Sequence, residues 1–194
     1  MMLKNLDKYQ VILASNSPRR RELLSGLDID YTVRVMDDID ESYPDNLPCA
    51  DIPCYISRKK AEAYKQQMRQ DELIITADTV VCVDDMILGK PKDADDAAAM
   101  LRLLSGKTHQ VITGVTLLTS EQEKTFSVVS DVTFDDLSDE EIEYYVTKYR
   151  PFDKAGAYGI QEWIGYVGVT SLKGSYFNVM GLPVQRLYNE LKTM

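Results

Sequence analysis

The sequence predicts an α/β fold in which a long central mixed β-sheet is flanked by helices. Three observations support this: a strand, helix and strand open the chain, helical and extended segments then alternate, and two long extended segments follow each other at 109–119 and 124–135. Interleaved elements of this kind pack best as helices on the faces of one sheet. With 194 residues, 44% of them hydrophobic, the chain can form one substantial core, and we expect a single domain over residues 1–194.

The expected elements of the first part are a strand at 9–14, a helix at 18–26 and an extended segment around 31–35. Ser17 can cap the helix, and Pro18 suits its first position because the missing amide hydrogen has no intrahelical partner there. The alternating residues Tyr31, Val33 and Val35 predict a half-buried strand. The chain should therefore open with a β-α-β unit.

After a proline-containing loop, we expect a helix at 52–69, a strand at 73–77, and a strand plus hairpin at 80–88. Apolar residues at helical spacing, among them Ile52, Tyr55, Ile56, Ala63 and Met68, predict the buried face of the helix. The short apolar strand ends at Asp78. The pair Asp84-Asp85 is typical of a hairpin turn.

The remaining expected elements are a helix at 93–105, strands at 109–119 and 124–135, a helix at 138–148, a strand at 163–169 and a last helix begun by Pro183. The first of these is rich in alanine, carries acids early and is followed by Gly106 as a C-terminal cap. A polar turn at 121–123 predicts that the two long strands form a hairpin. Ser138 and Glu141 have the spacing of a capping box.

The net charge of −9 and pI near 4.7 argue against nonspecific binding to nucleic acid or to an anionic membrane. An anionic ligand would need a local basic pocket. No apolar run approaches the roughly 20 residues that span a bilayer, and no signal-peptide core opens the chain, so we expect a cytoplasmic protein. The sequence leaves the oligomeric state open, a homodimer included. With His109 as its only histidine, acid–base chemistry should fall to carboxylates or lysine.

The segment Ser15–Arg20 predicts an anion site. Free amides and the partial positive charge of a helix N-terminus favour phosphate. The arginines Arg19, Arg20 and Arg21 stand where the helix dipole disfavours cations, and a bound anion would explain them. The alternative is that they are simply solvated.

Several further polar residues follow predicted strands or turns. Asp78 borders a buried segment and needs a cation or a donor; it is either a structural carboxylate or a metal ligand or base for water. Glu41 ends an acidic run that is otherwise a solvated surface. Lys60 and Lys90 can each place a charge on a phosphate, or lie on the surface. Gln161 offers a donor and an acceptor to a nucleobase edge.

Five ordered sequence blocks closely resemble the Maf family of nucleotide pyrophosphatases, over about residues 10–191. They are Ser15–Arg20 with Glu22-Leu23-Leu24, Ala77–Val81, Gly89-Lys90-Pro91, Leu104-Ser105-Gly106 and Lys154–Gln161. The residues Gly89, Glu162 and Trp163 have no counterpart that we can assign in the family pattern.

The resemblance implies a two-lobed fold akin to inosine triphosphate pyrophosphatases, with a cleft between the lobes. It also implies hydrolysis of a nucleoside triphosphate to the monophosphate and pyrophosphate with a divalent metal, Mg²⁺ or Mn²⁺. Carried over by motif position, Asp78 would be the catalytic carboxylate and would share the metal and water with Glu41. The residues that would bind phosphates are Ser15, Arg20, Lys60 and Lys90.

Within the family, the residues Arg19, Thr79 and Gln161 resemble the dTTP/UTP pyrophosphatase branch. A branch acting on 7-methyl-GTP carries Trp at the Arg19 position, where it could stack on a cationic purine. The implied role is the removal of pyrimidine nucleotides from the pool, with an association with cell-division arrest. Two alternatives stay open: a nucleotide-binding regulator of septum formation with incidental turnover, and a sugar-phosphate hydrolase.

Overall fold

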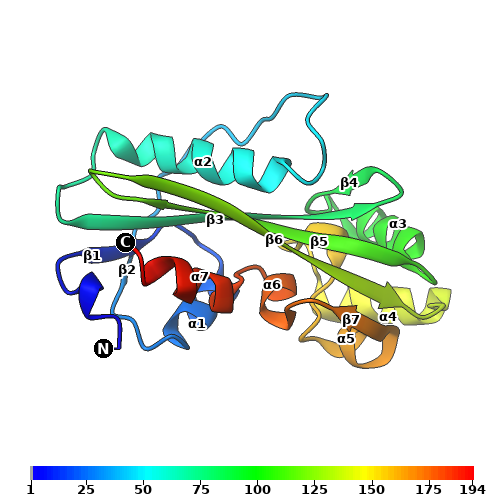
Figure 1. The fold of residues 1–194 in the computed structure, drawn as a ribbon. Helices are drawn as coiled ribbons and strands as arrows, with labels where there is room; N and C mark the ends of the chain where they lie inside the picture. The colour runs from blue at the N-terminus through cyan, green and yellow to red at the C-terminus, as the bar shows by residue number, and fades with distance from the viewer. Residues whose placement is uncertain (1) are drawn as a thin grey trace. The chain divides into compact units, whose positions relative to one another are not determined.

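The computed structural model describes residues 2–194, and their strands form one seven-stranded sheet (Figure 1). The strands are β1 (Gln10–Leu13), β2 (Thr32–Val33), β3 (Glu72–Val83), β4 (Met86–Leu88), β5 (Thr108–Leu118), β6 (Glu123–Phe134) and β7 (Val169–Lys173). Their order is β2-β1-β3-β5-β6-β7, with β4 paired to β3. β1 is parallel to β2 and β3, whereas β4 is antiparallel to β3 and β7 to β6. The prediction of a mixed sheet is confirmed.

Helices account for most of the remaining ordered elements. They are α1 (Pro18–Ser25), α2 (Ile52–Lys65), α3 (Ala94–Leu104), α4 (Asp139–Tyr149), α5 (Trp163–Gly168), α6 (Tyr176–Met180) and α7 (Val184–Leu191), with short 3₁₀ helices at Lys4–Leu6 and Ala155–Ala157. Within residues 2–194, no helix combines the length and the apolar composition needed to cross a bilayer.

The described chain divides into two compact units. The first contains residues 2–78, 113–128 and 181–194, and the second contains 79–112 and 129–180. The chain passes from one unit to the other within β3, β5 and β6, and a fourth time between Met180 and Gly181. The first passage lies between Asp78 and Thr79, two residues of one predicted motif.

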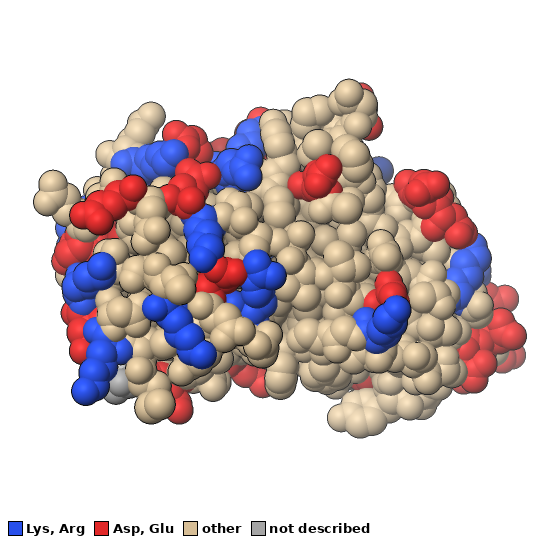
Figure 2. Space-filling model, viewed as in Figure 1, with Lys and Arg blue, Asp and Glu red and all other residues tan. Residues whose placement is uncertain are grey.

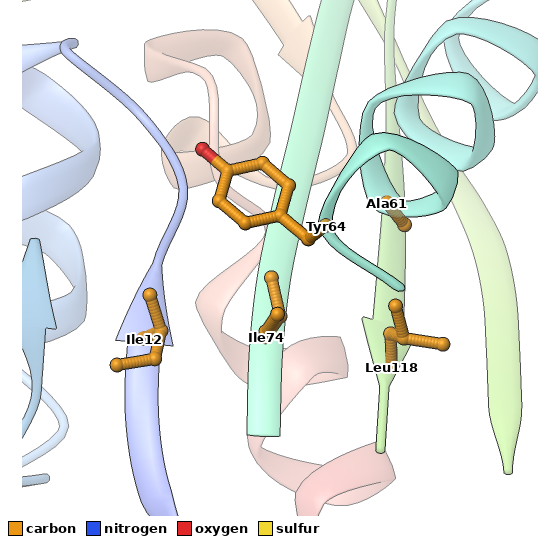
Figure 3. Packing of buried hydrophobic residues seen from close by; sticks show 5 residues of the cluster. All are labelled: Ile12, Ala61, Tyr64, Ile74 and Leu118. Atoms are coloured by element: carbon orange, nitrogen blue, oxygen red, sulfur yellow. The ribbon is translucent and has the colours of Figure 1, made fainter. Parts of the chain in front are cut away.

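The core of the first unit forms where α2 packs on three strands. Ile12 of β1, Ile74 of β3 and Leu118 of β5 meet Ala61 and Tyr64 of α2, and all five side chains are buried (Figure 3). The helix lies on one face of this part of the sheet, while α1 and α7 lie on the other (Figure 1). At about 1.5–3 kcal/mol for each large apolar side chain, this burial is a major stabilising contribution.

Several expectations for the first unit are wrong. β2 is short and lies at the edge of the sheet, so Val33 and Val35 are 40% and 37% exposed instead of half-buried. α2 ends at Lys65, four residues earlier than expected, with a turn in which the Gln67 amide donates to the Tyr64 carbonyl. Met68 therefore packs against the core from outside the helix. Local periodicity does not show where a helix ends when an apolar residue of the next turn also reaches the core.

The second unit confirms several local predictions. Asp84 and Asp85 both have positive φ, 48° and 61°, as a two-residue hairpin turn of the primed type requires, and they connect β3 to the antiparallel β4. Ser138 and Glu141 form the reciprocal capping box of α4.

The expected strand at 163–169 is wrong. Trp163–Gly168 is a helix, and β7 begins only at Val169. The helix follows a turn in which the Glu162 amide donates to the Gly159 carbonyl and the Gly165 amide donates to the Glu162 carbonyl. In a six-residue segment that contains two glycines, these contacts outweigh the weak local propensity.

Candidate functional site

The N-terminus of α1 has the geometry that the sequence predicts. The Ser17 side chain accepts a hydrogen bond from the Arg20 amide, and Pro18 occupies the first turn. The buried Ser15 Oγ accepts from the Ser17 amide at 3.2 Å. Ser15 thus lies where the chain leaves β1 and enters the helix.

Arg20 connects three parts of the first unit. Its Nη1 donates to the Ala77 carbonyl at 2.9 Å and to Ser15 Oγ at 3.5 Å, and its Nε donates to the Gly181 carbonyl at 2.8 Å. Burial lowers the pKa of the guanidinium, and Arg19 adds to this, whereas Asp78 and Glu41 oppose it. The side chain is therefore held firmly beside the residue that precedes Asp78.

Lys60 of α2 lies between two carboxylates. Its Nζ is 3.0 Å from Asp78 Oδ1 and 3.0 Å from Glu41 Oε2. The side chains of Lys60 and Asp78 are each only 14% exposed, whereas that of Glu41 is 54% exposed. A partly desolvated ammonium shared in this way balances charge that would otherwise be costly to bury.

The neighbour of Glu41 has a different partner. Asp40 accepts from Lys59 at 2.6 Å, and this bond, with help from Ser42, holds the pKa of the Asp40 carboxyl well below its usual range. Adjacent acids of the run therefore pair with adjacent lysines of α2, and only Glu41 shares a lysine with Asp78.

Five predicted site residues of the first unit are connected. Arg20 donates both to Ser15 Oγ and to the Ala77 carbonyl, and the next residue, Asp78, pairs with Lys60, which also pairs with Glu41. Asp78 lies in the middle of β3, not at a strand end as expected. On the face drawn in Figure 2, basic side chains lie interspersed with acidic ones.

The arginines flanking Arg20, Arg19 and Arg21, are both half-buried. Arg21 Nη2 donates to Asn16 Oδ1 at 3.3 Å in an exposed hydrogen bond, whereas its Nε atom is buried and has no hydrogen-bond partner among the described residues.

The second unit holds the other predicted site residues. Thr79 is half-buried in β3, and Lys90 is exposed directly after β4. The Gly89 carbonyl accepts from the Gly156 amide at 3.0 Å, so the turn that carries Lys90 contacts the segment that leads to Gln161. The Oε1 atom of Gln161 is buried and has no hydrogen-bond partner among the described residues.

Sequence reasoning missed one feature of each unit. The first is the carbonyl of Gly181, for which the sequence offers no signal because any residue supplies a carbonyl. The second is a buried group around Gln161, in which Lys154 pairs with Glu162 at 3.0 Å and Tyr145 donates to the same carboxylate. Burial and the adjacent Glu162 carboxylate raise the pKa of the Tyr145 phenol. The sequence did carry one signal of this group: Glu162 directly follows Gln161 and departs from the family pattern.

The donor set of the first unit fits a hard divalent cation. Among residues 2–194, no group of three or more His, Cys, Asp or Glu side chains forms a complete metal cage. Asp78 and Glu41 provide two carboxylates that lie on the same Lys60 ammonium, each 3.0 Å from Nζ. Mg²⁺ is commonly bound by one or two carboxylates together with substrate phosphates and water, so these two residues are suitable ligands.

Comparisons with known proteins agree with the motifs. A family model described as Maf-like protein matches residues 10–194. A dTTP/UTP pyrophosphatase of Bacteroides thetaiotaomicron is 63% identical over 193 residues and covers 100% of both chains. A dTTP/UTP pyrophosphatase of Flavobacterium psychrophilum is 47% identical over 188 residues, covering 97% of this chain and 96% of that protein.

A solved structure is more distantly similar. It is a nucleoside-triphosphatase, or dITP/XTP pyrophosphatase, from Mycobacterium abscessus, with a TM-score of 0.40 and 16% identity over 64% of this chain and 72% of that one. This similarity is too low to carry an argument.

Proposed function

Since this chain belongs to the Maf family, we propose that it hydrolyses the pyrimidine nucleoside triphosphates dTTP and UTP to the monophosphate and pyrophosphate. The observation that carries the proposal is the ammonium of Lys60 between the carboxylates of Asp78 and Glu41. Relatives that match the full chain and are named dTTP/UTP pyrophosphatase support the substrate class.

We assign the phosphates to Ser15, Arg20, Lys60 and Lys90. The support is strongest for Arg20 and Ser15, which lie at the N-terminus of α1 and contact each other. Cations and amides at such a position stabilise both the bound triphosphate and the charge that develops as the anhydride breaks. Lys90 is exposed, so its assignment rests on the motif alone.

We assign a divalent metal, Mg²⁺ or Mn²⁺, to Asp78 and Glu41. When bound, the metal would neutralise phosphate charge and polarise the phosphoryl group. Lys60 contacts both carboxylates and would remain beside them as a second positive charge for the phosphates.

Asp78 is the proposed general base. Its half-buried carboxylate can accept a proton from the attacking water, whose oxygen becomes bonded to phosphorus as the α–β anhydride breaks. Replacing this carboxylate should therefore slow turnover strongly while leaving in place the side chains that we assign to the phosphates.

We assign base recognition to Arg19, Thr79 and Gln161. A carboxamide oxygen accepts from the ring N–H of uracil or thymine, and its NH₂ group and the Arg19 guanidinium can donate to ring carbonyls. The extra methyl of thymine is worth roughly 1 kcal/mol, so discrimination between dTTP and UTP should be weak. The single domain, the cytoplasmic location and a homodimer stay predictions.

The decisive experiment compares Asp78→Asn with Asp85→Asn. Asp85 is an exposed hairpin residue with φ of 61°, a conformation that Asn tolerates, so it serves as a matched control. With dTTP and Mg²⁺, Asp78→Asn should lose at least about 100-fold in kcat but still bind dTTP, because general-base catalysis is worth roughly 10²–10⁴. Pyrophosphate should be the released product.

Three outcomes would contradict the proposal. Undiminished turnover of Asp78→Asn would remove Asp78 as the base. Release of orthophosphate irrespective of the base would indicate a sugar-phosphate hydrolase. Tight binding of dTTP without turnover by the unaltered protein would favour a nucleotide-binding regulator.

A further inference from the structure

Three polar side chains that the proposed chemistry does not use form a network in the second unit. Glu162 accepts from Tyr145 at one carboxylate oxygen and pairs with Lys154 at the other, 3.0 Å away. Lys154 is 8% exposed and also donates to Asp153 at 2.8 Å. Such a network is stabilising only when each member is satisfied, so it fixes one arrangement of its surroundings.

The network holds the turn that begins at Gly159. The Gly159 amide donates to the Tyr145 hydroxyl at 3.0 Å, and the Gly159 carbonyl accepts from the Glu162 amide at 2.9 Å. The turn is thus attached to Glu162 through both its side chain and its backbone.

The space above Gly159 is filled by three side chains. A Cβ added there would lie 3.0 Å from Glu162 Cδ, 3.0 Å from Lys154 Cε and 3.1 Å from Gln161 Nε2. The Gln161 carboxamide therefore lies beside the Glu162 carboxylate and the stem of Lys154, and movement of either would change its position.

The Gln161 carbonyl oxygen has no partner of its own among residues 2–194. It is buried, and a buried acceptor without a donor costs about 1–3 kcal/mol. Such an atom in a native protein needs an explanation, and a bound ligand that donates an N–H to it would provide one.

We propose that Glu162, held by Tyr145 and Lys154, is a positioning residue that fixes the Gln161 carboxamide for recognition of the pyrimidine ring N–H. This rests on the proposed function, in which Gln161 reads the base. Uracil and thymine carry a proton on N3, whereas cytosine has an acceptor there. A fixed carboxamide oxygen therefore favours UTP over CTP, two substrates with the same triphosphate and the same ring size.

The test measures the ratio of kcat/KM for UTP to that for CTP in Glu162→Gln and Tyr145→Phe. Glu162→Gln keeps the shape but removes the ion pair with Lys154; Tyr145→Phe removes the hydroxyl that joins Glu162 to Gly159. Because one hydrogen bond is worth a net factor of about five to ten, we expect the ratio to fall about five- to tenfold in each variant. The loss should appear as a higher KM for UTP with kcat nearly unchanged.

Glu143→Gln is the matched control. Glu143 is exposed on α4, two residues before Tyr145, so its substitution should leave the ratio unchanged. A double variant separates positioning from general damage. If Glu162 acts through Gln161, then Glu162→Gln should not lower the ratio further in a Gln161→Ala background.

The outcomes distinguish the two proposals. If Gln161→Ala leaves the ratio unchanged, the base-reading part of the proposed function is wrong. If Gln161→Ala lowers the ratio while Glu162→Gln and Tyr145→Phe lower UTP and CTP turnover equally, the positioning role alone is wrong. If one of the two variants does not fold, the other decides by the same criterion; if neither folds, the network is structural and the positioning role is rejected.

Discussion

His109 gives a prediction whose size follows directly from its surroundings. The ring is 1% exposed in the second unit and packs edge-on against Phe134 and Tyr158, with centroids 5.2 and 5.3 Å away. Its Nε2 forms a hydrogen bond of 2.7 Å with the Tyr158 hydroxyl. Burial lowers the pKa of His109 from 6.5 to about 4, so the folded protein holds the imidazole neutral.

The sign of the pH effect follows from this shift. Between pH 6.5 and 4 the unfolded chain binds a proton on His109 that the folded protein does not, so unfolding takes up a proton. The contribution of the neutral His109 imidazole to the free energy of unfolding is fully present above pH 6.5 and is lost as the pH falls toward 4. The loss is about 1.4 kcal/mol per pH unit, or about 3 kcal/mol over the whole window.

The assay is urea denaturation at several pH values between 4 and 7, for the unaltered protein and for His109→Phe. Because His109 is the only histidine, the difference between the two curves isolates one imidazole from the carboxylates. We expect a shallower decline of the unfolding free energy in His109→Phe. As a control, Phe134→Leu should lower stability at every pH and keep the slope. Equal slopes in the unaltered protein and His109→Phe would refute the reasoning.

Two further predictions concern stability in the first unit. A Cβ at Gly114 would lie 2.3 Å from the Pro53 carbonyl carbon. Gly114→Ala should therefore displace α2 and lower the free energy of unfolding, measured by urea denaturation, by about 1–3 kcal/mol. Gly89→Ala is the control and should be neutral, because no atom lies within 4 Å of the added carbon. Arg34 donates twice to the fully buried Glu72 at 2.8 Å, and this bond lowers the pKa of that carboxyl. Arg34→Met should lower the free energy of unfolding by about 2 kcal/mol near neutral pH, less than the 3–5 kcal/mol of a fully buried pair because Arg34 is 37% exposed. This loss should shrink as acid protonates Glu72. A thermal melt that shows no effect of Arg34→Met at neutral pH would contradict the prediction.

Local signals in the sequence predicted the elements they control. The cap at Ser17, the capping box of Ser138 with Glu141, and the turn at Asp84-Asp85 each depend on residues within four positions of one another. All the residues that form each of these features are neighbours in the sequence, so the local sequence was enough to predict them.

What the sequence could not predict depends on distant contacts. The hydrogen bond from Arg20 to the Gly181 carbonyl joins residues 161 positions apart, and it uses a backbone atom that every residue has. The helix at Trp163–Gly168 and the network at Glu162 likewise depend on where α4 packs. The motif resemblance predicted the residues of the candidate site, which stay a prediction, but it did not predict how they pair: the position of Lys60 between Asp78 and Glu41 required the structure.

The bonds of Arg20 also have a consequence for synthesis of the chain. A polypeptide is made from its N-terminus, so Arg20 and Ala77 exist long before Gly181, which lies 104 residues after Ala77. Such non-local contacts form late in folding, since most of the chain must first be ordered. The Arg20 guanidinium therefore cannot gain its full set of acceptors on a nascent chain, and a truncated product that stops before Gly181 would lack one of them however well its own strands were formed.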